Sequence, residues 1–246
     1  MTPDRDLRVR SELRDTLETA AAALGLSVST GQSTQLLDFV ELLARWNRTY
    51  NLTAIRDPAN MLTQHVVDCL AVVPALRREG RGGRVLDVGS GGGLPGLIWA
   101  VIEPEVDVTC VDSVGKKAAF VQQAVTALGL RNLHSEHGRV EALTAAPFDL
   151  ITSRAFATLQ TFVSLTAPLL KEGGAWVAMK GRIPSGEIDA LPANVDMFHV
   201  EPLHVPGLEA ERCLVWMRPA AANAIQKIPL KKSVDLLTTT RIGASE

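Results

Sequence analysis

The spacing of hydrophobic residues changes once along the chain, close to residue 83. Before that point apolar residues recur every three or four positions, which is typical of amphipathic helices. The pattern predicts helices over residues 5–24, over about 32–48, and from Pro58 onward. Their apolar faces are expected to form core, and Gly25 is placed to end the first helix.

After residue 83 short apolar runs alternate with helical segments, which indicates a doubly wound α/β fold. Seven strands are predicted, and the last two would form a terminal hairpin. The predicted strands are 84–88, 106–112, 131–136, 148–153, 175–180, about 197–201 and 211–217. The predicted helices among them are 95–102, 114–128 and 157–170. The expected sheet is parallel, with an antiparallel strand at its end.

A glycine-containing linker, Arg81-Gly82-Gly83, divides these two patterns. The sequence therefore predicts a helical N-terminal extension over residues 1–80 and a sheet-containing domain over 81–219. Residues 220–246 contain lysines and a run of threonines, and we expect them to form a flexible tail.

The strand at 84–88 runs directly into the glycine-rich segment Gly89–Gly96, where Pro95 suits the first turn of a helix. Backbone without Cβ atoms can approach a bound nucleotide closely, and a free helix N-terminus favours electron-rich groups. The segment therefore predicts a nucleotide-type cofactor site. Three of its glycines stand at alternate positions: Gly89, Gly91 and Gly93.

Two cofactors fit this segment. Gly91–Gly96 satisfies the dinucleotide pattern G-x-G-x-x-G, which would suit NAD. Asp87 precedes Gly89 by two residues, and the resulting D-x-G-x-G-x-G resembles the first motif of class I S-adenosylmethionine (SAM) methyltransferases, where the acid lies near the methionine end of the cofactor. Asp112 ends the next strand, where a carboxylate can accept the ribose hydroxyls of either cofactor. We favour SAM, with NAD as the alternative.

Other strand ends supply further candidates, because ligands of open α/β sheets bind at the carboxyl ends of the strands. Backbone groups of the Val140–Glu141 turn could meet an adenine edge, although Glu141 could equally be a surface residue. Arg154 follows the strand at 148–153 and is expected to project into the cleft, where a buried guanidinium needs a carboxylate or phosphate partner. Lys180 ends the next predicted strand.

The segment Arg45–Pro58 is dense in Asn, Thr, Arg and aromatic residues. Aromatic faces, amides and arginines together can hold single-stranded RNA. The alternative is a helix C-terminus capped by Asn side chains, with Trp46 and Tyr50 packed in the core. His65 and Asp68 stand three residues apart on the following helix and could pair in a structural hydrogen bond.

Composition narrows the class of protein. The chain of 246 residues is 46% hydrophobic and 21% charged, as in ordinary soluble proteins. A formal net charge of −2 is not that of a typical nucleic-acid binder, which counts mildly against an RNA substrate. Basic residues nevertheless gather locally. The groups are Arg45, Arg48 and Arg56; Arg77, Arg78, Arg81 and Arg84; and Lys180 and Arg182.

Neither a metal site nor a membrane segment is predicted. The three cysteines are far apart and fit neither a disulfide framework nor a metal site. The longest uncharged apolar run, Leu70–Leu76, is too short to span a bilayer, and the N-terminus has no signal-peptide pattern. We expect a cytoplasmic protein.

Two missing motifs restrict the chemistry. No Asn/Asp-Pro-Pro-Tyr/Phe stretch follows the fourth predicted strand, which argues against methylation of an exocyclic amine, and no Pro-Cys pair could attack a pyrimidine carbon. A ring nitrogen with a free lone pair, such as guanine N7, needs no deprotonation. Positioning could then do most of the work, with Arg154, Lys180 or Arg182 holding phosphate or base.

Taken in order, the motifs resemble the RsmG (GidB) family over about residues 35–218. That family uses SAM to methylate N7 of a guanosine in 16S ribosomal RNA of the small subunit. The resemblance implies a class I SAM-dependent methyltransferase fold, a Rossmann-like seven-stranded sheet with a helical N-terminal extension. The matching segments are Trp46–Thr53, His65 with Asp68, Leu86–Gly96, Asp112–Lys117, Arg139–Glu141, Ser153–Phe156 and Lys180–Gly181.

The resemblance also implies roles for particular residues. The SAM contacts would be Gly89, Leu94, Val140, Glu141 and Arg154, with Asp112 as the ribose acid; the motif itself adds Asp87, Gly91 and Gly93. Arg154 and Lys180 would position the substrate, with no general base. The expected RNA contacts are Arg45, Arg48, Tyr50, Asn51, His65, Lys180 and Arg182.

The sequence therefore predicts a cytoplasmic guanine-N7 methyltransferase that acts on 16S ribosomal RNA or on the small-subunit particle. One alternative is a small-molecule methyltransferase, in which the segment after Trp46 would be a lid. The other is a non-catalytic SAM-binding module on RNA.

Overall fold

The computed structural model describes residues 3–80 and 82–221, with side chains from Leu7 onward. The predicted tail lies outside the described residues except for Ala220 and Ala221, and so does Arg81 of the predicted linker.

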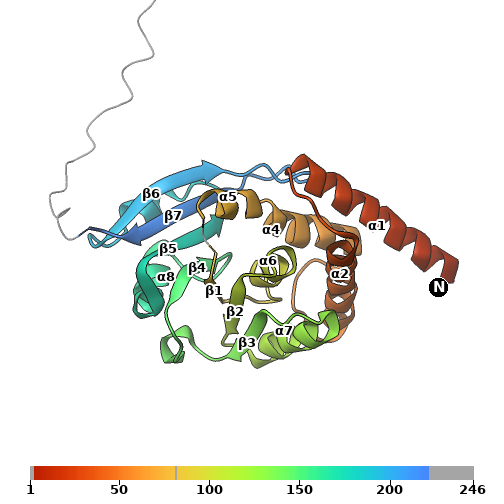
Figure 1. Cartoon of the computed structure of the whole chain (residues 1–246), viewed down its shortest axis with the longest axis horizontal. Helices are drawn as coiled ribbons and strands as arrows, with labels where there is room; N and C mark the ends of the chain where they lie inside the picture. Colours follow the sequence, from red (N-terminus) through yellow and green to blue (C-terminus); the bar gives the residue numbers. More distant parts are fainter. Residues whose placement is uncertain (1–2, 81, 222–246) are drawn as a thin grey trace, which may run out of the picture.

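Seven strands form one sheet in the order β3-β2-β1-β4-β5-β7-β6 (Figure 1). The first five strands are parallel, and β7 runs antiparallel to both of its neighbours. The predicted seven strands and terminal hairpin are confirmed, but β7 is not the edge strand, because β6 follows it outward. The strands are β1 (Arg84–Val88), β2 (Asp107–Asp112), β3 (Leu133–His137), β4 (Phe148–Ser153), β5 (Leu170–Lys180), β6 (Val195–Pro202) and β7 (Cys213–Pro219).

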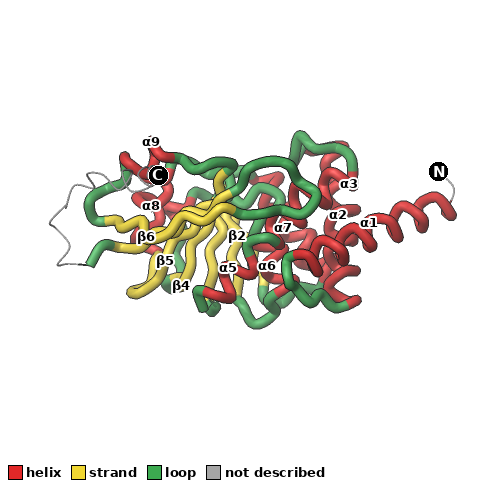
Figure 2. The backbone as a smooth tube through the Cα atoms, turned by 90° about the horizontal axis from the view of Figure 1, so that it is seen from above, coloured by secondary structure: helices red, strands yellow, loops and turns green. Residues whose placement is uncertain are grey.

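Helices cover both faces of the sheet. On one face lie α6 (Gly96–Ile102) and α7 (Gly115–Leu128), and on the other lies α8 (Leu159–Thr166), which the short α9 (Ser185–Asp189) accompanies (Figure 2). Successive strand residues alternate between the two resulting cores: Val85 belongs to the first core and Leu86 to the second. Each strand therefore anchors both layers.

The N-terminal part contains two long helices, α1 (Pro3–Ala23) and α2 (Thr30–Tyr50). The predicted third helix is broken into α3 (Pro58–Met61), the π-helical segment η1 (Leu62–Val67), α4 (Asp68–Leu70) and α5 (Val73–Arg78). The first half of α1 projects beyond the rest of the molecule, whereas the other helices lie against the sheet domain (Figure 1).

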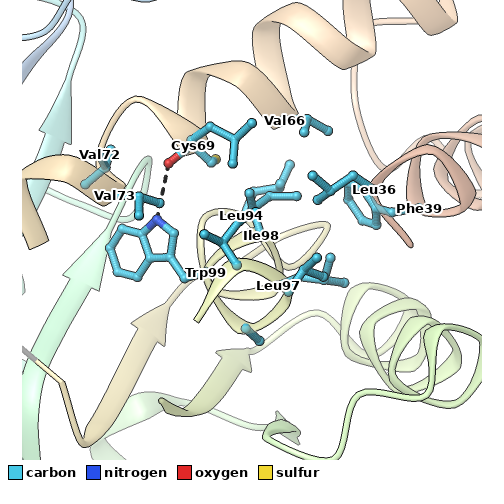
Figure 3. Close-up of a cluster of buried hydrophobic side chains, with 14 of the residues drawn as sticks. Leu36, Phe39, Val66, Cys69, Val72, Val73, Leu94, Leu97, Ile98 and Trp99 are labelled. Carbon is cyan, nitrogen blue, oxygen red and sulfur yellow. Dashed lines mark hydrogen bonds between the residues drawn. The ribbon is translucent and has the colours of Figure 1, made fainter. Parts of the chain in front are cut away.

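The N-terminal helices share one core with the sheet, as their apolar faces predicted. Val66, Cys69 and Val73 pack on α6, where Trp99 donates its indole N–H to the Cys69 carbonyl at 3.3 Å (Figure 3). Leu36 and Phe39 of α2 reach the same cluster. The extension is therefore packed directly onto the layer that carries the glycine-rich loop.

One segment, Pro58–Arg78, is long and apolar enough to cross a membrane by length and composition, with a mean hydropathy of 1.2. Within the fold, 72% of its most apolar stretch is buried, and the core helix of a soluble protein meets the same criterion. The segment serves here as the contact between the extension and α6.

Candidate active site

The loop between β1 and α6 has the backbone conformation that its glycines predicted. Gly89, Gly91 and Gly93 adopt φ angles of +66°, +60° and +81°, a region that L side chains rarely occupy. A Cβ atom on Gly89 would also lie 2.9 Å from the Phe156 ring. The loop is therefore sterically restricted to glycine at these positions, and it brings bare backbone to the carboxyl edge of the sheet.

Asp112 holds this loop in place from the end of β2. Its Oδ2 accepts the Gly91 N–H and its Oδ1 accepts the Val114 N–H, both at 2.9 Å, and Lys117 Nζ lies 3.8 Å from Oδ2. The carboxylate is nearly buried, and it faces a cavity of about 610 Å³ at the carboxyl ends of β1, β2 and β4. A cavity of this size suits a nucleoside-sized ligand.

Several of the predicted cofactor residues line this cavity, and others do not. The lining includes Gly89, Asp112, Val140, Glu141 and Phe156. Val140 and Glu141 form the short 3₁₀ turn η2 (Val140–Ala142) after β3, and the Glu141 carboxylate pairs with Arg139 at 3.1 Å. The predicted residues outside the lining are Asp87, Gly91, Gly93, Leu94 and Arg154; Leu94 packs in the main core (Figure 3).

Asp87 is completely buried beneath the loop. Its Oδ2 accepts the Gly96 N–H at 2.8 Å, whereas Oδ1 has no hydrogen-bond partner within the described chain. Burial raises the pKa of Asp87 to about 7, although the Gly96 N–H and the charge of Arg154 act in the opposite direction. The buried Oδ1 therefore lacks a hydrogen bond from the described residues to compensate its lost hydration.

The raised pKa of Asp87 should change how the free energy of unfolding depends on pH. Because the folded-state pKa lies above the ordinary value of 3.8, the native protein holds the proton longer than the unfolded chain, so Asp87 lowers stability as pH rises from about 4 to 7. We expect Asp87→Asn to gain stability relative to the unsubstituted protein across that window, measured by urea unfolding at each pH. Asp149→Asn is the control. Bonds from the Arg84 N–H and Lys171 lower the pKa of Asp149, so its contribution to stability changes only below about pH 4. The relative stability of Asp149→Asn should therefore stay nearly constant from pH 4 to 7, and a gain like that of Asp87→Asn would contradict the assignment.

Arg154 was expected to project into the cleft, but its side chain turns to the N-terminal helices instead, because a carboxylate partner lies there. Its Nη1 lies 3.4 Å from Asp68 Oδ2, 3.4 Å from His65 Nδ1 and 3.3 Å from the Gln64 carbonyl oxygen. The predicted direct pairing of His65 with Asp68 is replaced by this arrangement, in which Arg154 contacts both.

His65 connects Arg154 to the polar segment. Its Nε2 lies 2.9 Å from Thr53 Oγ1. Burial, together with the nearby positive charge of Arg154, lowers the pKa of His65 to about 4, so the ring is neutral at physiological pH. His65 therefore acts as a neutral hydrogen-bonding link between the segment after α2 and Arg154.

The Arg45–Pro58 segment combines both arrangements considered from the sequence. Trp46 packs on Phe120 with ring centroids 5.6 Å apart, as the core alternative predicted, whereas Tyr50 stacks on Trp46 and stays 43% exposed. Asn51 ends α2 in the left-handed conformation, at φ 48°. Lys116 of α7 donates to the Tyr50 carbonyl at 2.8 Å, which joins the end of α2 to the helix beside the cavity.

Asn47, which was not among the predicted site residues, anchors this segment. It is buried, its Nδ2 donates to the Ile55 carbonyl and its Oδ1 accepts the Thr53 N–H, both at 2.9 Å. Asn47→Ala leaves two part-buried backbone groups unpaired, so we expect a loss of about 1–3 kcal/mol in unfolding free energy. Thermal and urea unfolding would measure it. Asn51→Gly, which relieves a left-handed residue, is the neutral control.

The residues of the predicted basic groups differ in whether they form ion pairs. Arg77, Arg78 and Arg84 pair with Glu103, Glu201 and Asp107, so these three are engaged within the protein. Arg81 of the same group lies outside the described residues. Lys180 pairs with Glu187 at 2.9 Å. Four further arginines form no ion pair or side-chain hydrogen bond with any residue that the structure describes: Arg45, Arg48, Arg56 and Arg182. Arg45 and Arg48 lie in the second half of α2, Arg56 lies in the segment after it, and Arg182 follows β5, and all four remain available to an anionic partner.

The parallel sheet with an inserted antiparallel β7, together with a glycine loop and a strand-end acid around a nucleoside-sized cavity, is the arrangement of class I SAM-dependent methyltransferases. The crystal structure of TrmN from Thermus thermophilus shares this fold, with a TM-score of 0.51 and 22% identity over 62% of this chain and 49% of that one.

Sequence comparison assigns the family. The family model described as rRNA small subunit methyltransferase G (GidB) matches residues 32–215, and the chain belongs to this family. A protein named ribosomal RNA small subunit methyltransferase G from Acidovorax ebreus (strain TPSY) is 57% identical over 86% of this chain and 97% of its own. One of the same name from Leptothrix cholodnii is 56% identical over 84% of this chain and 95% of its own. The family predicted from the motifs is confirmed.

Proposed function

We propose that this protein transfers the methyl group of SAM to N7 of a guanosine in 16S ribosomal RNA of the small subunit. The observation that carries the proposal is the family match over residues 32–215, together with relatives more than 50% identical along nearly their whole length. It follows that the protein works in the cytoplasm, where ribosomal subunits are assembled, and that its partner is 16S RNA or the particle that contains it.

The residues around the cavity fit SAM. The Asp112 carboxylate would accept the ribose hydroxyls, and the Val140–Glu141 backbone would meet the adenine edge. The orphaned Oδ1 of Asp87 suits the ammonium of the methionine part, and the absence of a Cβ atom on Gly89 leaves room for Phe156, which lines the cavity with it. When bound, SAM supplies a methyl group on a positively charged sulfur. The chain's own part is to hold that group and exclude water.

The side chains around Arg154 are consistent with methylation at N7 of guanine. The N7 lone pair is free, so no proton must be removed before attack, and orientation can supply most of the rate. Both ring nitrogens of the neutral His65 are engaged, with Thr53 and with Arg154. We infer that His65, Arg154 and Lys180 help to position the RNA substrate, and that none of them acts as a general base.

RNA would bind across the carboxyl edge. Arg45, Arg48, Arg56 and Arg182 would contact phosphate, and the exposed face of Tyr50 suits a stacked base. Asn51 lies on the same segment. Lys180 would exchange Glu187 for an RNA phosphate. A net charge of −2 is low for an RNA enzyme, which fits a target presented within a ribosomal particle.

Methyl transfer from labelled SAM tests the proposal. The acceptors are small subunits and naked 16S RNA from a bacterial strain that lacks this family's enzyme, and the labelled nucleoside is identified by mass spectrometry. We expect N7-methylguanosine, with the particle and naked RNA compared for rate. SAM binding without incorporation would favour the two alternatives, a small-molecule methyltransferase or a non-catalytic SAM-binding module on RNA. A small-molecule acceptor would then distinguish between them.

A further inference from the structure

Two arginines from distant parts of the chain meet on one buried carboxylate. Asp68 lies in α4, and its side chain is only 3% exposed. Its Oδ1 accepts Arg212 Nε at 2.7 Å, whereas its Oδ2 lies 3.4 Å from Arg154 Nη1. Arg212 precedes β7 and is 144 positions from Asp68 in sequence.

The connection between β6 and β7 brings Arg212 to this place. The Arg212 carbonyl accepts the Leu203 N–H at 2.7 Å, which closes the base of the connection. Within the connection Val205 is buried, and a Cβ atom on Gly207 would lie 3.6 Å from the Thr63 side chain of η1. The connection therefore packs on the N-terminal helices, and Arg212 is held where those helices meet the sheet.

The two contacts differ in length, and the difference has a physical consequence. A buried carboxylate is stable only when hydrogen bonds and opposite charge compensate its lost hydration. Arg212 makes the close, charge-assisted bond, and Arg154 stays at a longer distance. If Arg212 were absent, Arg154 would be the remaining cation beside Asp68 and would be drawn toward it. Its guanidinium would then move away from the Gln64 carbonyl and His65 Nδ1, which it now contacts at 3.3 and 3.4 Å.

We propose that Arg212 is a positioning residue for methyl transfer: by satisfying the charge of Asp68, it keeps Arg154 from closing on that carboxylate and leaves its guanidinium on the Gln64 carbonyl and His65, the link to the proposed RNA-binding segment after α2. This inference rests on the proposed function, because Arg154 matters only if the site binds SAM and substrate. Arg212 touches neither the cavity nor the candidate RNA segment. Its effect is therefore exerted through Asp68.

The substitution Arg212→Gln tests the proposal. We expect the turnover rate on small subunits, normalised to the folded fraction, to fall roughly 10- to 100-fold, since misplacement of a positioning group by about 1 Å has effects of that size. The matched control is Arg218→Gln at the other end of β7, whose arginine pairs with Asp196 on the surface. That variant should keep the wild-type rate.

A second substitution separates positioning from a general loss of structure. Asp68→Asn removes the charge that would attract Arg154, so in the double variant the Arg212→Gln substitution should lower turnover by less than threefold relative to Asp68→Asn alone. An equal loss in both backgrounds would overturn the proposal. So would a wild-type rate for Arg212→Gln. An inactive wild-type protein would instead contradict the proposed function, so the two failures can be told apart.

Discussion

Replacement of Asp112 by alanine is expected to abolish detectable methyl transfer and to weaken SAM binding roughly 100-fold. The carboxylate would lose its proposed ribose contacts, and the Gly91 and Val114 N–H groups that it accepts would lose their partner, so the glycine loop would be less well ordered. Hydrogen bonds to charged groups contribute about 1.5–3 kcal/mol each, and loss of one or two accounts for an effect of this size. Titration calorimetry with SAM measures the affinity directly.

Asp107→Ala is the matched control, because Asp107 begins the same strand and pairs on the surface with Arg84 and His134. It should bind SAM as tightly as the unsubstituted protein. An affinity within threefold of wild type for Asp112→Ala would show that this carboxylate does not contact the cofactor, and the assignment of the cavity to SAM would then fail.

The second large effect is expected on the RNA side. Substitution of Arg45, Arg48 and Arg56 together by glutamine should raise KM for small subunits about tenfold or more and leave SAM affinity unchanged, because each arginine is unpaired and available to phosphate. The salt dependence should weaken as well, by about 0.7 in the log–log slope for each lost phosphate contact on single-stranded RNA. Binding and rate measured across a salt series give both quantities.

Arg131→Gln is the control for loss of a positive charge outside the proposed RNA surface. Arg131 is exposed, and it follows α7 at the amino edge of the sheet, away from the proposed RNA surface. Its loss should leave KM unchanged. If the triple variant and Arg131→Gln behave alike, the arginines around α2 have no specific part in recognition.

The fold was predictable wherever local pattern determines it. Strands 84–88 and 148–153 agree with β1 and β4 at both ends, because buried parallel strands are short apolar runs bounded by clear turns. The third helix begins at Pro58 as predicted, but its π-helical segment was not predicted. A π-helical segment at Leu62–Val67 adds residues to the turn that carries His65. The side-chain partners of His65, Thr53 and Arg154, come from other elements. Such contacts leave no periodic signal in the sequence.

The site was predictable in part for the same reason. Gly89 and Asp112 stand beside strand ends, which the topology of α/β sheets brings together, and the cavity lies there. Arg212 has no such signal, because its partner Asp68 lies in a helix at the opposite end of the chain. Ion pairing likewise distinguishes Arg78, which is paired with Glu201, from Arg48, although sequence composition treats both as members of basic groups.

The core that α6 shares with the N-terminal helices also limits how this protein can be divided or recombined. Removal of residues up to 80 would expose Trp99 and its neighbours in this cluster to water, because α2 and α4 pack on α6 and the Cys69 carbonyl accepts the Trp99 indole N–H (Figure 3). The extension is thus not an interchangeable module. A chimera that takes its N-terminal helices from another methyltransferase must also adopt the matching α6, so the proposed RNA-binding segment and the core packing are inherited together.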